Sequence, residues 1–144
     1  MPITPFHFGP AALVKGVISR YFSFLAFGLT QGLIDLEPLY YMATDAWPIH
    51  RFFHTYLGAT VAAILVLLLG KRVCAVLVRL WNWRLSEEQK QWLAINPDIS
   101  LLALATGAFF GAYSHVFLDS IMHSDMQPFA PFTEVNHIAV FHLD

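Results

Sequence analysis

Long apolar runs separated by short polar stretches make up most of this chain. The runs cover residues 11–18, 21–34, 56–70 and 101–123, and the last of them ends in polar residues. Runs of this kind predict helices, and residues 50–55 lengthen the third run enough for it to cross a bilayer. The pattern therefore predicts an all-α bundle with short helices.

Two segments between these runs have a less certain secondary structure by their sequence pattern. Residues 35–48 contain Pro38 and Pro48, and we expect a loop there. Residues 73–83 are largely apolar, with Arg79 inside the stretch and two tryptophans at its end, which favours a stretch that lies at the membrane interface.

Capping signals mark the second half of the chain. Ser86-Glu-Glu-Gln89 has the spacing of a capping box and predicts a short surface helix, which Asn96-Pro97-Asp98 should end. Ser100 is expected to cap the last long helix, which should run to about His123. The tail after Pro128 is rich in proline and phenylalanine and is too short and broken to span a membrane.

The amino-acid composition indicates that these helices belong to a membrane protein. The chain is 57% hydrophobic and 12% charged, with a mean hydropathy of +0.56, whereas soluble domains carry about 25% charged residues. We therefore expect a small multi-pass membrane helical bundle, with residues 1–144 as a single membrane-embedded domain. The net charge of −2, without a basic stripe, excludes a nucleic-acid partner. The single cysteine, Cys74, excludes an internal disulfide.

The membrane setting decides how the first two runs are arranged. One helix over residues 10–34 would span roughly 36 Å and leave Lys15 and Arg20 in lipid. A hairpin that turns near Ser19 moves both charges toward one side. We therefore expect the hairpin, with His7 and Asp35 at the same rim of the bundle.

All seven histidines and most acidic residues lie at the same ends of the apolar segments, and nearly all basic residues lie at the other ends. The basic set comprises Lys15, Arg20, Lys71, Arg72, Arg79, Arg84 and Lys90, and only Arg51 joins the histidines. This sorting predicts one polar rim. By the positive-inside rule the basic loop 71–90 is cytoplasmic, so the histidine rim faces the opposite side of the membrane.

The last helix carries the clearest candidate chemistry. His115, Asp119 and His123 follow one another at spacings of four, so neighbouring members project from one helical face. Gly107 and Gly111 precede them on the same spacing, and small residues there let a second helix approach closely. A packing stripe thus leads into a polar stripe.

The other segments offer ligand-type side chains as well. His50 and His54 are one turn apart and can hold one metal ion from a single helix face. Asp35 and Glu37 flank Leu36, where both can reach one cation or one can ligate while the other acts as base.

Simpler interpretations stay open for individual residues. His7 is as readily an interhelical hydrogen-bond partner, and Asp119 can cap the helix or pair with Arg51. The convergence of four segments on one rim nevertheless favours a metal site, because buried ionisable groups in membranes are costly unless paired or metal-bound. Five residues are interpreted as ordinary tail or solvated rim positions: Asp45, Asp125, Glu134, His137 and His142.

The order of these motifs resembles the predicted membrane-bound, metal-dependent hydrolases of bacterial inner membranes. The matching stretches are His7, Asp35-Leu-Glu37, His50-Arg-Phe-Phe-His54-Thr55, Ser114-His115-Val-Phe-Leu-Asp119 and Pro128-Phe-Ala-Pro131. Glu37 stands where the family has a second aspartate, and the His50–His54 spacing is one residue shorter than the family pattern. The resemblance implies hydrolase activity and the bacterial inner membrane as its location.

We therefore expect a membrane-bound, metal-dependent hydrolase acting on a lipid-borne ester or phosphoester. A mixed histidine and carboxylate set suits zinc, with manganese or iron as alternatives. Glu37 or His50 is expected to be the general base or to support the ligands, and membrane lipid is the expected partner. The alternative function is that of a non-enzymatic accessory or structural subunit of a larger membrane complex. The expected protein partners are further copies of this chain or the members of such a complex. The expected ligands are His7, Asp35, His54, His115 and Asp119.

Overall fold

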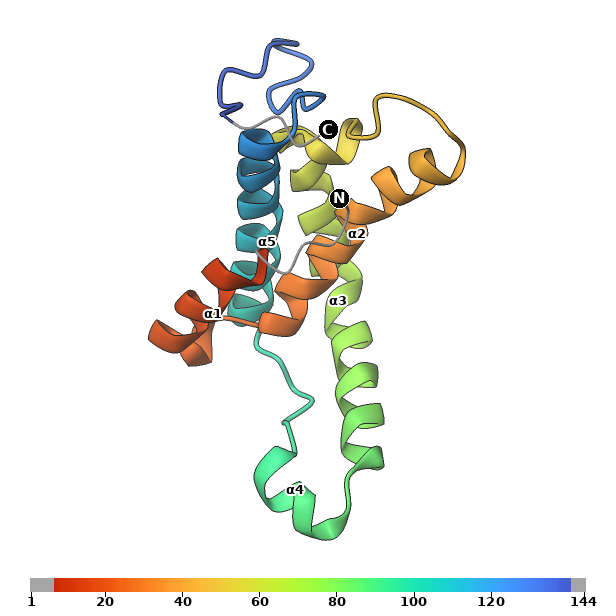
Figure 1. Ribbon diagram of the computed structural model, residues 1–144. Helices are drawn as coiled ribbons and strands as arrows, with labels where there is room; N and C mark the ends of the chain where they lie inside the picture. Colours follow the sequence, from red (N-terminus) through yellow and green to blue (C-terminus); the bar gives the residue numbers. More distant parts are fainter. Residues whose placement is uncertain (1–6, 141–144) are drawn as a thin grey trace.

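The computed structural model describes residues 7–140, and this part of the chain contains helices and no strand. The all-α prediction is confirmed (Figure 1). The elements are α1 (Phe8–Val17), η2 (Ser19–Tyr21), α2 (Phe24–Ala43), η3 (Phe52–His54), α3 (Tyr56–Arg84), α4 (Glu87–Leu93) and α5 (Leu101–Met122), where η marks a single 3₁₀ turn.

α5 packs against both α2 and α3, and small residues let the three backbones approach closely. A Cβ atom added at Gly107 would lie 2.2 Å from the carbonyl oxygen of Ser23, and one added at Gly111 would lie 3.0 Å from that of Phe27. The α3 side of the core is also built from alanines, among them Ala59 and Ala62. The predicted packing stripe on α5 is therefore confirmed, and α2 is the helix that packs on it.

The chain breaks between α1 and α2, as the hairpin prediction requires. The hydroxyl of Ser23 caps α2 by accepting a hydrogen bond from the backbone N–H of Ala26. Lys15 donates to the carbonyl oxygens of Ser19 and Phe22 at 2.7 and 2.9 Å, so its charge is held at the turn. The break returns α2 along α5 and brings the start of α1 to the polar rim.

The loop predicted over residues 35–48 is wrong at its beginning. α2 continues through Pro38 to Ala43, and Asp35 and Glu37 lie within this helix. A proline inside a helix removes one backbone hydrogen bond. Pro38 is fully buried, so packing against the bundle offsets that loss.

The bounds predicted for the third helix are wrong at both ends. Residues 50–55 do not extend it, because Thr55 caps α3 and His54 belongs to η3. The turn folds back so tightly that a Cβ atom added at Gly58 would lie 1.8 Å from the carbonyl oxygen of Phe52. At the other end the helix runs without a break to Arg84, so much of the predicted basic loop 71–90 is helical.

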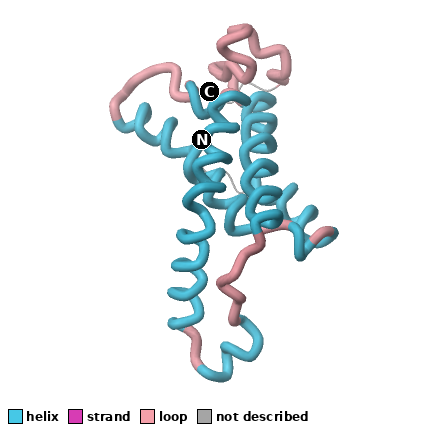
Figure 2. Tube along the Cα trace, turned by 180° about the vertical axis from the view of Figure 1, so that it is seen from behind, coloured by secondary structure: helices cyan, strands magenta, loops and turns pink. Residues whose placement is uncertain are grey.

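The capping predictions in the second half are confirmed. Ser86 and Gln89 form a reciprocal capping box at the start of α4, and Ser100 caps α5. Figures 1 and 2 show α4 at one end of the molecule, while the tail after α5 and the segment before η3 share the other end. α3 and α5 are long and apolar enough to cross a membrane, with mean hydropathies of 2.4 and 1.6.

Candidate metal centre

A cluster of buried ionisable side chains fills the end of the bundle where α2, α5, the start of α1 and the turn before α3 meet. All five residues predicted as ligands belong to it and are at most 4% exposed. They come from four separate segments, so the structure brings the predicted set together. The full cluster contains His7, Asp35, His50, His54, His115, Asp119 and His123.

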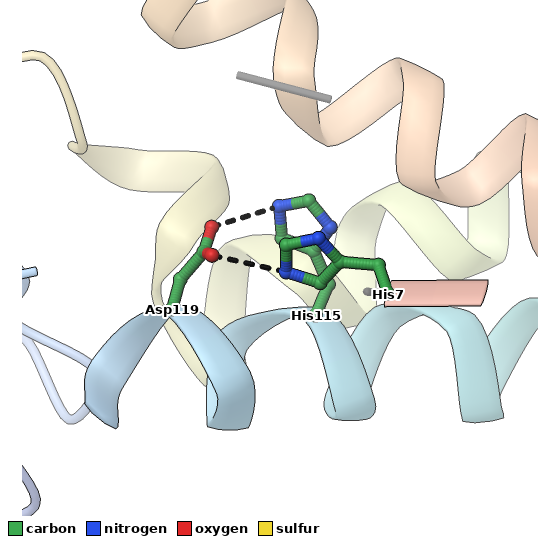
Figure 3. A group of neighbouring side chains, drawn as sticks. All are labelled: His7, His115 and Asp119. Atoms are coloured by element: carbon green, nitrogen blue, oxygen red, sulfur yellow. Dashed lines mark hydrogen bonds and ion pairs between the residues drawn. The ribbon is translucent and has the colours of Figure 1, made fainter. Parts of the chain in front are cut away.

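Asp119 lies at the centre of the cluster. Its Oδ1 atom is 3.0 Å from Nε2 of His7, and its Oδ2 atom is 3.1 Å from Nε2 of His115 (Figure 3). The rings of His7 and His115 are stacked, with centroids 4.6 Å apart. The Oδ2 atom also lies 3.6 Å from Nε2 of His54. One carboxylate thus contacts three imidazoles, and Asp119 does not pair with Arg51, whose guanidinium lies over the Tyr41 ring.

Gln31 fixes the orientation of His115. Its side-chain N–H donates to the carbonyl oxygen of Gly111 at 3.0 Å, which leaves its Oε1 atom facing Nδ1 of His115. Nδ1 of His115 must therefore carry a hydrogen, because Oε1 can only accept. In a neutral ring, Nε2 then presents a lone pair to the cluster.

Glu37 does the same for His54. Its carboxylate lies 3.1 Å from Nδ1 of His54 and also accepts hydrogen bonds from the backbone N–H groups of Arg51 and Phe53. Burial lowers the pKa of His54 to about 4, and the hydrogen bond with Glu37 only partly opposes this. His54 is therefore neutral at pH 7, and its Nε2 atom also presents a lone pair.

The resulting donor set fits a divalent cation. The Nε2 atoms of His54 and His115 lie 3.3 Å apart, and Asp35 Oδ1 is 3.6 Å from Nε2 of His115. Together with Asp119, two nitrogen lone pairs and two carboxylates thus converge. Ligand atoms of Asp35, His54 and His115 lie within 4.8 Å of one another, as do those of His7, His115 and Asp119. Imidazole and carboxylate ligands are the ones that zinc, manganese and iron accept.

His50 lies beside this set and is held by Asp125, which the sequence pattern did not indicate as part of a site. Nδ1 of His50 is 2.7 Å from Oδ1 of Asp125, whose other oxygen accepts from the backbone N–H groups of Ile49 and His50. The interpretation of Asp125 as solvated rim is wrong, because its side chain is only 4% exposed. Burial raises the pKa of Asp125, but the contacts with His50 and the two N–H groups outweigh this and lower it.

The remaining residues interpreted as rim or tail positions lie away from the centre or outside the described residues. Asp45, Glu134 and His137 are exposed, as expected of rim and tail residues. His142 lies outside the described residues. Gln31 was missed, although it precedes Asp35 by four residues on α2 and so shares its face.

A cavity of about 680 Å³ opens next to the centre. His50 is part of both, since it lines the cavity and its ring packs against His54 at a centroid distance of 4.7 Å. Arg51 brings a positive charge to the lining, which is otherwise largely apolar and includes Trp47 and Phe52. The cavity therefore suits a molecule with an apolar body and an anionic group.

A scan of protein-family models finds no match to this chain, and searches of curated proteins and of solved structures find none either.

Proposed function

We propose that this protein is a membrane-bound, metal-dependent hydrolase. The observation that carries the proposal is the pair of Nε2 atoms of His54 and His115, which face one another beside two carboxylates while Glu37 and Gln31 hold the opposite ring nitrogens. Buried lone pairs and negative charges arranged in this way call for a cation. The ligands are His7, Asp35, His54, His115 and Asp119, with zinc as the metal and manganese or iron as alternatives.

The metal would supply Lewis acidity to activate water and polarise the ester. Of the two residues expected to act as base or support, Glu37 has the contacts of a support, because it binds His54 and two backbone N–H groups. His50 borders the cavity, so we place the reaction there. The apolar lining and Arg51 favour a lipid-borne ester or phosphoester as substrate.

The proposed location is the bacterial inner membrane, with α3 and α5 as spans. Two features support it: the hydropathy of these helices and the exposed tryptophans near the far end of α3, Trp81 and Trp83. Tryptophan is enriched at membrane interfaces. In this arrangement the segment 71–90 is cytoplasmic and the metal centre lies toward the opposite side.

A second candidate is an accessory subunit of a larger membrane complex. The contacts between His7 and Asp119 and between Gln31 and His115 favour it in part, because each joins two helices and can act as a purely structural bond. In that case the protein needs no metal.

Metal analysis of the purified protein separates the two candidates. Wild type should retain a divalent ion through purification and His115→Ala should lose it, whereas the exposed control His137→Ala should keep it. A hydrolase should also gain thermal stability when zinc is added to chelator-treated protein, since metal that binds only the folded state stabilises it. Metal-free wild type whose stability is unchanged by zinc would leave only the accessory subunit.

A further inference from the structure

Three side chains next to the proposed centre form another set of metal-type ligands: His50, His123 and Asp125. One ligand atom from each lies within 4.8 Å of the others. The rings of His50 and His123 are 4.5 Å apart, and His50 contacts Asp125 at 2.7 Å. We propose that these residues hold a second divalent cation and that the centre is dinuclear, an inference that rests on the proposed function for its first ion.

The second site is built by the tail. His123 ends α5, and Asp125 follows it in the turn that the chain makes toward the segment before η3. Asn136 holds this turn by donating to the carbonyl oxygens of Ser120 and His123 at 2.9 and 3.3 Å. Farther along, the backbone N–H of Tyr56 donates to the carbonyl of Pro128, so the tail is fastened to the first turn of α3. The ligand positions are thus fixed in advance of binding.

A further group of ligand-type side chains spans the two sites. His50, His54 and Asp119 form a group whose ligand atoms also lie within 4.8 Å of one another. This group contains two ligands of the first site and one of the second. In two-metal hydrolases the ions stand about 3.5–4 Å apart and share a carboxylate-rich pocket. Such a pair of ions needs two adjacent sets of ligands with a carboxylate between them, and Asp119 has this position here.

Charge balance also favours two ions. Four buried or nearly buried carboxylates line this end of the bundle: Asp35, Glu37, Asp119 and Asp125. Within the described residues, Arg51 is the permanent cation at this end, and its guanidinium lies over the Tyr41 ring, 3.7 Å from the ring centroid. One divalent ion balances the charge of two of these carboxylates, and two divalent ions balance all four while the neighbouring histidines stay neutral.

The second ion would also narrow the substrate class. His50 and Arg51 both line the cavity, so an ion bound to His50 would lie at the cavity wall. A phosphate ester with an apolar body matches two neighbouring cations and an arginine better than a neutral carboxylic ester does.

Metal stoichiometry tests the second site. Full-length protein is stripped with a chelator, reloaded with Zn²⁺ and measured by elemental analysis and calorimetry. Wild type should bind two ions per chain, and Asp125→Asn and His123→Ala should each bind one. The matched control His137→Ala removes an exposed histidine from the same tail and should bind two. Loading with Mn²⁺ adds a spectroscopic readout, because wild type should give the spin-coupled resonance of a pair and Asp125→Asn that of a single ion.

The outcomes separate this inference from the proposed function. One ion in wild type and one in both variants would overturn the second site and leave the first intact. No ion in wild type would overturn both. If Asp125→Asn does not fold, as judged by circular dichroism, the His123→Ala stoichiometry decides, since that substitution leaves the bonds from Asp125 to the backbone in place.

Discussion

His54 shows how a single residue can be kept ready for metal at neutral pH. It is completely buried, its Nδ1 atom contacts Glu37, and its Nε2 atom faces Nε2 of His115, another proposed ligand. Burial lowers its pKa from about 6.5 to about 4, so protons do not compete with a cation for Nε2 near pH 7.

This shift predicts a pH dependence of stability in the metal-free protein. Between pH 6.5 and 4 an unfolded His54 is protonated while the folded one is not, so the unfolded state binds more protons and stability falls as the pH falls. The loss should reach no more than about 3 kcal/mol. Unfolding of chelator-treated protein at pH 7.5, 6 and 4.5 measures it.

His54→Gln removes one titrating ring and should make this profile shallower, with the lowered pKa of His123 leaving part of the slope in place. The exposed control His137→Gln should leave the profile unchanged. Equal slopes in wild type and His54→Gln would show that His54 does not cause the dependence.

At the same scale, the ligand-type residues could be predicted but their partners could not. The sorting of histidines and carboxylates toward one rim predicts the five ligand candidates, and the structure gathers all five in the buried cluster. The burial of Asp125 could not be predicted, because it depends on a turn that only tertiary contacts define. The pairing of His115 with Gln31 depends on how α2 packs on α5, which no local pattern encodes.

At the scale of elements, helix ends set by local caps could be predicted, whereas segments decided by packing could not. The caps at Ser86 and Ser100 could be predicted because a cap is a local hydrogen bond between a side chain and nearby N–H groups. Pro38 and residues 50–55 were misinterpreted because local signals compete there with burial. The proline stays helical in a packed interior, and the two histidines meet through a folded-back turn instead of a helix face.

The contact between α2 and α5 gives a prediction at this scale. Gly107→Ala places a Cβ atom 2.2 Å from the carbonyl oxygen of Ser23, which must push the helices apart. We expect a loss of about 1–3 kcal/mol in stability, together with weaker metal binding because Asp35 and His115 lie on the two helices. Thermal unfolding and metal titration measure both effects.

Gly32→Ala is the matched control, since a Cβ atom there meets nothing within 4 Å. It should leave the protein as stable as wild type or slightly more stable, because alanine favours the helix. If Gly107→Ala were as harmless as Gly32→Ala, the close approach of the two helices would not be what holds the centre together.

For the whole molecule, the polarity of its two ends predicts its orientation in the membrane. Single cysteines at Gln89 and Val135, in a Cys74→Ser background, place a thiol at each end. An impermeant reagent applied outside intact cells should label position 135 and spare position 89, and cell lysis should expose both. Labelling of position 89 from outside would reverse the orientation.

The contact between His7 and Asp119 joins residues 112 positions apart, and Asp125 adds a partner from still later in the chain. The ribosome must therefore have synthesised the chain at least as far as Asp125 before the pocket can form. Until then neither the first nor the last segment has its neighbours, and an ion finds no complete set of donors. Binding of the proposed metal must therefore follow the synthesis of α5, and a chain cut short before His115 would lack two of the five proposed ligands of the first site.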